Sequence, residues 1–235
     1  MPFRFRVALA AVMLSALPAM VWAQTSPTPK PADTPTSAAP PPAAAPVAPA
    51  HVDGFRSAKW GMTEAQVKAA IRADFNIAED KLKSTENPAE KTQVMSITVP
   101  DLLEGAGTAQ ASYIFGYTSK KLIQVNILWS SVLDPQATPQ KIVAAADQLR
   151  VLFLGEGYDP HTVATNARTP DGSILVFVGQ DADKHTTVLR LATGTVTPTE
   201  KDGKPGKPVE AAALTLSYIL DAKEPDIYRL KKGQF

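Results

Sequence analysis

Alternation of apolar and polar residues is the pattern that most constrains the fold of this chain. In 94–99 the apolar residues Met95, Ile97 and Val99 are separated by polar residues, and similar alternation recurs in 111–117 and 122–129. Because successive side chains of a strand point to opposite faces, each segment is predicted to be a strand buried on one face. The short turn T-S-K-K at 118–121 predicts that the last two strands form an antiparallel hairpin.

Two helices are predicted from their start signals. Thr63 is followed three residues later by Gln66, which is the pattern of a capping box, and apolar residues then recur at helical spacing as far as Phe75. Thr138 precedes Pro139 at the first helical position, and a second apolar stripe follows as far as Phe153. A short helix is also expected at 77–82.

Three more strands are predicted after the second helix, at 173–179, 186–192 and 211–220. The order helix then strands thus occurs twice. The sequence predicts an α+β fold of two tandem units, each a short helix or helical pair followed by a three-stranded antiparallel sheet. The predicted units are 51–134 and 135–235.

The first fifty residues predict export and a linker. Arg4 and Arg6, the apolar run from Val7 to Trp22 and the small residue Ala23 have the order of a secretory signal, so 1–23 is expected to be cleaved. The run is shorter than the roughly 20 residues that span a bilayer, so no stable membrane anchor is expected after cleavage. Nine prolines and eight alanines in 24–50 predict a disordered linker, whose proline motifs could alternatively bind a groove.

Charge and cysteine content narrow the functional classes. The chain has no cysteine, so neither a disulfide nor a lipid-modified cysteine is expected. Without Arg4 and Arg6, 22 basic residues face 23 acidic ones, which gives no general attraction for nucleic acid. The predicted location is periplasmic or secreted.

One short segment resembles a known fold family. K-W-G-M-T-E-A-Q-V at 59–67 is similar to the helix entrance G-M-T-x-x-Q-V of the β-lactamase inhibitory protein fold and of the SmpA/OmlA-type outer-membrane assembly lipoproteins. The resemblance implies a short helical pair before an antiparallel sheet, and a protein-binding module. The chain departs from the lipoproteins because it lacks their cysteine, and its second helix entrance reads Gln136-Ala137-Thr138-Pro139.

A search for chemistry finds one candidate cluster. Asp181, Asp183 and His185 would share one face of an extended chain, and two carboxylates with an imidazole could hold a divalent cation. The alternative is that they form the solvated tip of a hairpin. His51 lies at the end of the predicted linker and His161 in a loop. The common local motifs for nucleophilic, zinc or phosphoryl chemistry do not occur, so no catalytic residue and no cofactor is predicted.

Two other groups are candidates for binding. Leu102 and Leu103 lie in a glycine-rich connection, where an exposed apolar pair would mark a partner contact, unless the loop folds back on the sheet. Four aromatic residues could line a carbohydrate platform or pack in the core: Trp60, Tyr113, Tyr117 and Trp129.

The sequence therefore predicts a secreted, periplasmic, non-enzymatic binding or envelope-accessory protein. Its expected partner is an envelope protein or a cell-wall component of unknown identity. The alternative is a metal-dependent or carbohydrate-acting periplasmic enzyme that uses Asp181, Asp183 and His185.

Overall fold

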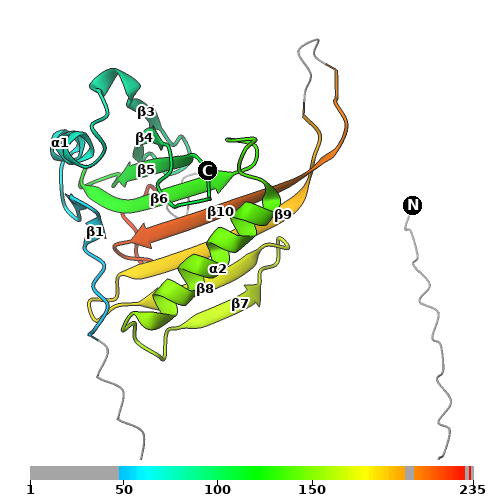
Figure 1. Ribbon diagram of the computed structural model, residues 1–235. Helices are drawn as coiled ribbons and strands as arrows, with labels where there is room; N and C mark the ends of the chain where they lie inside the picture. Colours follow the sequence, from blue (N-terminus) through cyan, green and yellow to red (C-terminus); the bar gives the residue numbers. More distant parts are fainter. Residues whose placement is uncertain (1–47, 199–203, 231–232, 234–235) are drawn as a thin grey trace, which may run out of the picture. The chain divides into compact units, whose positions relative to one another are not determined.

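Eight strands of the described residues form one antiparallel sheet (Figure 1). The computed structural model describes residues 48–198, 204–230 and 233, so the predicted signal and most of the predicted linker lie outside the described residues. The strand order is β3-β4-β5-β6-β10-β9-β8-β7. The strands are β3 (Lys83–Glu86), β4 (Gln93–Val99), β5 (Ala109–Phe115), β6 (Leu122–Ser130), β7 (Ala164–Arg168), β8 (Ile174–Gln180), β9 (Thr186–Val196) and β10 (Val209–Ile219).

The prediction of two tandem units with three-stranded sheets is wrong. β6 and β10 pair along seven residues and join the strands before and after α2 into one sheet, within a single compact unit from Ala45 to Phe235. Each half of this sheet also has a fourth strand that was not predicted, β3 and β7. Every residue of both strands is exposed, so neither has the apolar alternation that reveals a half-buried strand. The described fold is mostly β.

Both predicted helix starts are confirmed. In α1 (Glu64–Phe75) the Thr63 hydroxyl accepts from the Gln66 backbone N–H, while the Gln66 side chain accepts from the Thr63 backbone N–H. α2 (Pro139–Gly155) begins at the Thr138 cap, with proline in its first turn. The expected helix at 77–82 is only the single turn η1 (Glu79–Lys81).

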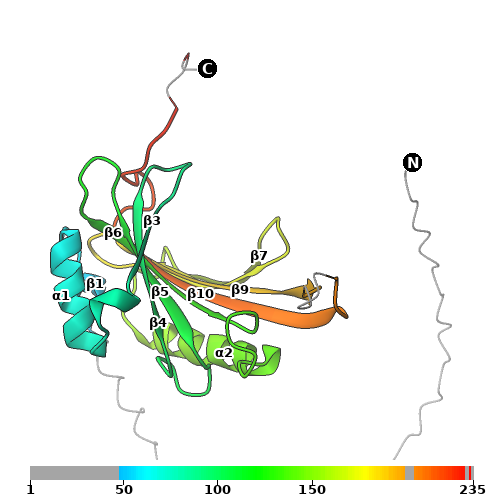
Figure 2. The same ribbon diagram turned by 90° about the horizontal axis from the view of Figure 1, so that it is seen from above.

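The core lies between the helices and one face of the sheet. Figure 2 shows α1 and α2 on one side of the sheet, with β3 and the C-terminal segment standing out on the other. Fully buried side chains from both halves belong to one cluster, among them Ile71, Tyr113, Trp129, Ile142 and Phe177. Because each large apolar side chain contributes about 1.5–3 kcal/mol when buried, this shared core favours one unit over two.

The first described residues form an ordered strap, which we call the N-terminal strap (residues 48–53). The backbone N–H of Ala50 donates to the carbonyl of Gly157 at 2.9 Å. A side chain on Gly157 would lie 2.3 Å from the Ala48 carbonyl oxygen, so this close approach requires glycine. The strap continues into the hairpin of β1 (Gly54–Phe55) and β2 (Ala58–Lys59). Thus the last residues assigned to the linker, and His51 after them, belong to the folded unit.

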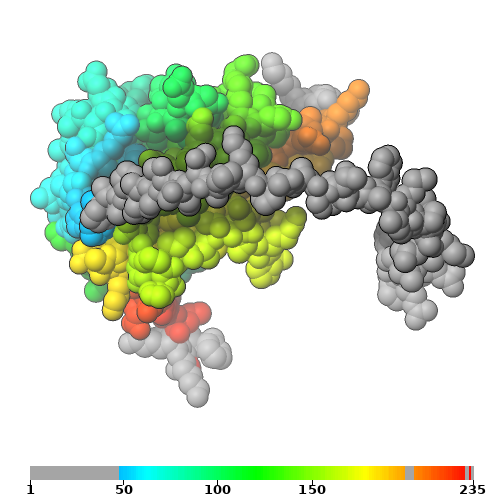
Figure 3. Space-filling model, turned by 60° about the horizontal axis from the view of Figure 1, so that its bottom comes forward, coloured from blue at the N-terminus to red at the C-terminus, as the bar shows by residue number. Residues whose placement is uncertain are grey.

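Other exposed features lie away from the core. The ends of β9 and β10 extend beyond the sheet as a two-stranded arm, seen in orange at one side of the space-filling view (Figure 3). None of the described helices is both long enough and apolar enough to cross a bilayer.

Candidate functional site

The face of the sheet opposite the helices is left uncovered by both α-helices (Figure 2). We call it the open face, and its side chains are half-buried or exposed on six neighbouring strands. Strand pairing places them in rows, one of which crosses the sheet as Ser96, Ser112, Asn126, Ser217, Val188 and Val178. The other members are Val94, Thr98, Gln110, Ile114, Gln124, Leu128, Leu175, Arg190, Thr215 and Ile219.

The open face is almost uncharged and mixes uncharged polar with aliphatic side chains. Among its described residues the only charged side chain is Arg190, and this guanidinium is already paired with Asp171 and donates to the Ser173 hydroxyl at 2.7 Å. Side chains bond to each other within the face: Gln124 Nε2 donates to Asn126 Oδ1 at 2.8 Å, and the hydroxyls of Ser96 and Ser112 lie 2.9 Å apart. The face therefore offers hydrogen-bonding groups without a net charge.

A C-terminal segment borders one end of the open face. The carboxylate of Asp226 accepts from the backbone N–H groups of Thr118 and Ser119, at 2.9 and 2.8 Å, and so caps the β5–β6 turn. Burial disfavours the charge on Asp226, but hydrogen bonds from Ser119 and Thr118 outweigh burial and lower its pKa. Two residues later, the backbone N–H of Tyr228 donates to the Glu90 carbonyl in the β3–β4 turn at 2.8 Å. The segment thus ties two turns together into a fixed wall.

A pocket of about 460 Å³ lies on the open face beside this wall. Gln110, Gln124 and Asn126 contribute amides, and Glu90 and Thr92 come from the β3–β4 turn. The other lining residues are Asn87, Val94, Ser112, Ile114, Leu128 and Thr215. We call it the amide pocket. Thr92 is fully buried, yet its hydroxyl has no hydrogen-bond partner among the described residues.

Asp181, the first predicted cation ligand, is a buried structural acceptor. Its Oδ1 accepts from the backbone N–H groups of Asp183 at 3.0 Å and His185 at 2.9 Å. Its Oδ2 accepts from the backbone N–H of Val52 at 2.8 Å and lies 3.2 Å from His185 Nδ1. A carboxylate has about four lone-pair sites, so three backbone donors occupy most of them and His185 Nδ1 lies beside the fourth.

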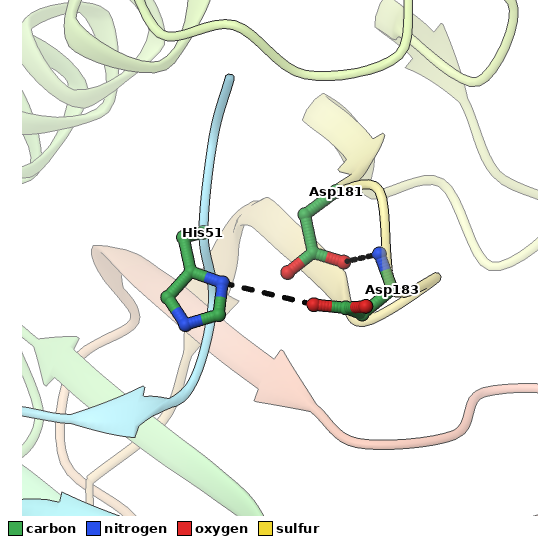
Figure 4. A group of neighbouring side chains, drawn as sticks. All are labelled: His51, Asp181 and Asp183. Atoms are coloured by element: carbon green, nitrogen blue, oxygen red, sulfur yellow. Dashed lines mark hydrogen bonds and ion pairs between the residues drawn. The ribbon is translucent and has the colours of Figure 1, made fainter. Parts of the chain in front are cut away.

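The residues that gather at this place differ from the predicted trio. Ligand atoms of His51, Asp181 and Asp183 lie within 4.8 Å of one another, whereas the predicted trio had His185 in the place of His51 (Figure 4). His51 Nδ1 is 3.8 Å from Asp183 Oδ2, and both side chains are more than 60% exposed. A cation bound by all three would have to displace a donor from Asp181. The arrangement therefore favours an anchor for the N-terminal strap over a cation site.

The remaining candidates pack against the core. Leu102 and Leu103 are partly buried against it, so their loop folds back on the body of the protein. Tyr113 and Trp129 are buried completely or nearly so, which removes them from any carbohydrate platform. Burial raises the pKa of the Tyr113 phenol.

Trp60 and Tyr117 also have structural contacts. Trp60 Nε1 donates to the Val52 carbonyl at 2.7 Å, and the indole meets the His185 ring edge to face. Tyr117 packs against Tyr228 of the C-terminal segment. His161 is exposed, and its backbone N–H donates to Asp159.

The sequence also held an unused signal for the open face. The polar residues that alternate with the predicted core positions, such as Ser96, Ser112, Asn126 and Ser217, are the ones that line it. Alternation alone assigns them only to the solvent side of each strand. Their shared lack of charge becomes visible once strand order is known.

Comparison with known proteins gives no relative for this chain: no family model, curated protein or solved structure matches it. Inference about its function therefore depends on the geometry of its own residues.

Proposed function

We propose that this protein is a non-enzymatic binding protein of the cell envelope that holds a partner protein on the open face. The observation that carries this proposal is the one-sided cover of the sheet, in which both described helices lie on one side and six strands are open on the other. With strands about 4.8 Å apart, these six span about 24 Å. The width suits a protein surface better than a small molecule.

The lack of charge indicates what kind of protein would bind. A partner that placed its own charged groups against this face would lose their hydration without gaining an opposite charge. A partner surface rich in uncharged hydrogen-bonding groups would exchange bonds with water for bonds with the Ser, Thr, Asn and Gln side chains. The proposed partner is therefore a folded protein whose contact surface is uncharged and offers hydrogen-bonding groups beside apolar ones.

The edges of the sheet are less suitable for binding than its face. In β7, Asn166 has a left-handed backbone with φ 54° and is skipped in the pairing with β8. Such an irregularity bends an edge strand and hinders addition of another strand. At the other edge, β3 has only four residues, with Lys83 and Glu86 at its ends. Short, charged edges also oppose strand addition.

Two sequence features support the rest of the proposal. The signal-like first 23 residues favour an exported, periplasmic location. The similarity of residues 61–67 to the β-lactamase inhibitory protein fold and the SmpA/OmlA-type proteins favours a protein-binding role. A carbohydrate partner is less well supported, because the six described strands place no aromatic ring on the open face for a sugar to stack on.

Site-specific photocrosslinking tests the proposal. A photoreactive residue at Ser217, near the middle of the open face, should capture one defined protein from the envelope of cells that make this chain. The matched control carries the same residue at Gln148, which is exposed on α2. The purified partner should then bind wild-type protein directly. Capture of the same protein from both positions, or of none from Ser217, would contradict a docking role for the open face.

A further inference from the structure

The amide pocket combines an unused donor and an unused acceptor at one place. Gln124 Nε2 donates to Asn126 Oδ1, which leaves Gln124 Oε1 and Asn126 Nδ2 without a partner among the described residues. Exchanging nitrogen and oxygen in both amides would leave the same pair of functions. One acceptor and one donor therefore belong to two residues of β6, Gln124 and Asn126, that both line this pocket.

A primary carboxamide matches this pair. Its N–H groups can donate to the Gln124 oxygen while its carbonyl accepts from the Asn126 amide. Val94, Ile114 and Leu128 add apolar lining for the methylene groups that carry such a carboxamide. Leaving the free amide groups of Gln124 and Asn126 unpaired is unfavourable, which disfavours a purely apolar occupant.

The charge of the residues that line the amide pocket disfavours anionic occupants. Its only ionisable lining residue is Glu90, whose Oε2 already accepts from Asn87 Nδ2 at 3.0 Å. An anion would meet no cation in this lining, so an anionic occupant is disfavoured. The choice of a neutral occupant rests on the free amide groups of Gln124 and Asn126.

We propose that the amide pocket is the anchor subsite of the open face and takes the carboxamide side chain of an Asn or Gln residue from the partner. This inference rests on the proposed function, and it names the group that the partner inserts. The bond from the Tyr228 backbone N–H to the Glu90 carbonyl holds one lining residue of the pocket in place before binding, which lowers the entropic cost of docking.

The test uses small probes on the whole protein and needs no partner. Propionamide carries the carboxamide, and butanone has nearly the same shape but lacks the donor. In ¹H–¹⁵N spectra, propionamide should shift the backbone signals of Ser112, Gln124 and Asn126, with butanone binding about tenfold more weakly because it leaves an acceptor unpaired. The third probe is N-acetylglucosamine, because the pocket could instead bind the acetamido group of a glycan.

Two variants identify the residues responsible. Asn126→Leu and Gln124→Met keep the side-chain size and remove one amide each, so each should weaken propionamide binding about tenfold. Thr98 lies on the same face but outside the pocket lining, so Thr98→Val should leave propionamide binding unchanged. Spectra of the folded variants before titration show that each retains its structure.

The outcomes separate this inference from the proposed function. Equal binding of butanone, binding that persists in both variants, or stronger binding of N-acetylglucosamine would overturn the carboxamide subsite. If propionamide fails while Ser217 still captures a partner, only the subsite is wrong. If propionamide binds and Ser217 captures nothing, the docking role of the face is wrong instead.

Discussion

The carboxylate of Asp181 accepts a hydrogen bond from the backbone N–H of Val52 at 2.8 Å, between residues 129 positions apart in the chain. This bond joins the N-terminal strap to the turn between β8 and β9. The Asp181 side chain is completely buried, and backbone N–H groups of the turn occupy its other oxygen. The polar turn between β8 and β9 thus contains a buried carboxylate, Asp181, that its own backbone N–H groups surround.

Removing the Asp181 carboxylate should lower the free energy of unfolding substantially. Asp181→Ala leaves three backbone donors without their acceptor, so we expect the free energy of unfolding to fall by about 3 to 5 kcal/mol. Asp183→Ala is the matched control, since its carboxylate is 63% exposed and its removal should change stability by no more than about 0.5 kcal/mol. Urea denaturation measures both. Equal, small effects would show that the strap does not depend on Asp181.

Trp60 should contribute through one hydrogen bond and its packing. Trp60→Phe removes the indole donor to the Val52 carbonyl and keeps an aromatic ring beside His185, so we expect a loss of about 1 kcal/mol in urea denaturation. Binding to the partner should be unchanged in the folded protein. A variant with unchanged stability that no longer binds would instead place Trp60 on a functional surface.

The sequence predicted those structural features that depend on residues close to one another in the chain. The Thr63 and Thr138 caps lie within three residues of the groups they satisfy, so both helix starts were correct. Three of the six predicted strands, at 94–99, 111–117 and 122–129, show clear apolar alternation, whereas β3 and β7 are exposed along their whole length. The pairing of β6 with β10 joins segments about ninety residues apart, and no local pattern specifies it.

The candidate site was harder to predict for the same reason. Asp181 resembles a solvated turn residue until Val52 is placed beside it, and His51 directly follows the proline- and alanine-rich residues of the predicted linker, which gives no sign of a fixed position. The open face exists only as a product of strand order. Its residues carry no motif, since Ser, Thr, Asn and Gln are ordinary on the solvent side of a strand.

Divalent metal should not stabilise the protein through His51, Asp181 and Asp183. A site filled at a hundred times its dissociation constant would add about 2.7 kcal/mol to the free energy of unfolding. Because most of the lone pairs of Asp181 are engaged, we expect Zn²⁺ to leave the thermal midpoint unchanged. A rise in the midpoint that His51→Ala abolishes would establish a metal site after all.

Acid should destabilise the fold partly through Asp171. Hydrogen bonds from Thr169 and Ser173, with Arg190 nearby, lower the pKa of Asp171 from 3.8 to about 2. A carboxyl with a depressed pKa stabilises the folded state above its unfolded pKa, and this contribution is lost as pH falls through the folded value. Between pH 3.8 and about 2, the urea midpoint of the wild type should therefore fall more steeply than that of Asp171→Asn. Parallel curves would contradict this role.

The most direct test of docking on the open face compares the affinity of the captured partner for two variants, each of which carries one added positive charge. Ser217→Arg places an unpaired cation in the middle of the neutral face and should weaken binding at least about tenfold, since a buried charge without a partner is strongly unfavourable. Gln148→Arg adds the same charge on exposed α2 and should bind like the wild type. Calorimetry of both folded variants decides the matter: a loss confined to Ser217→Arg is the predicted result, and equal affinities would contradict docking on the open face.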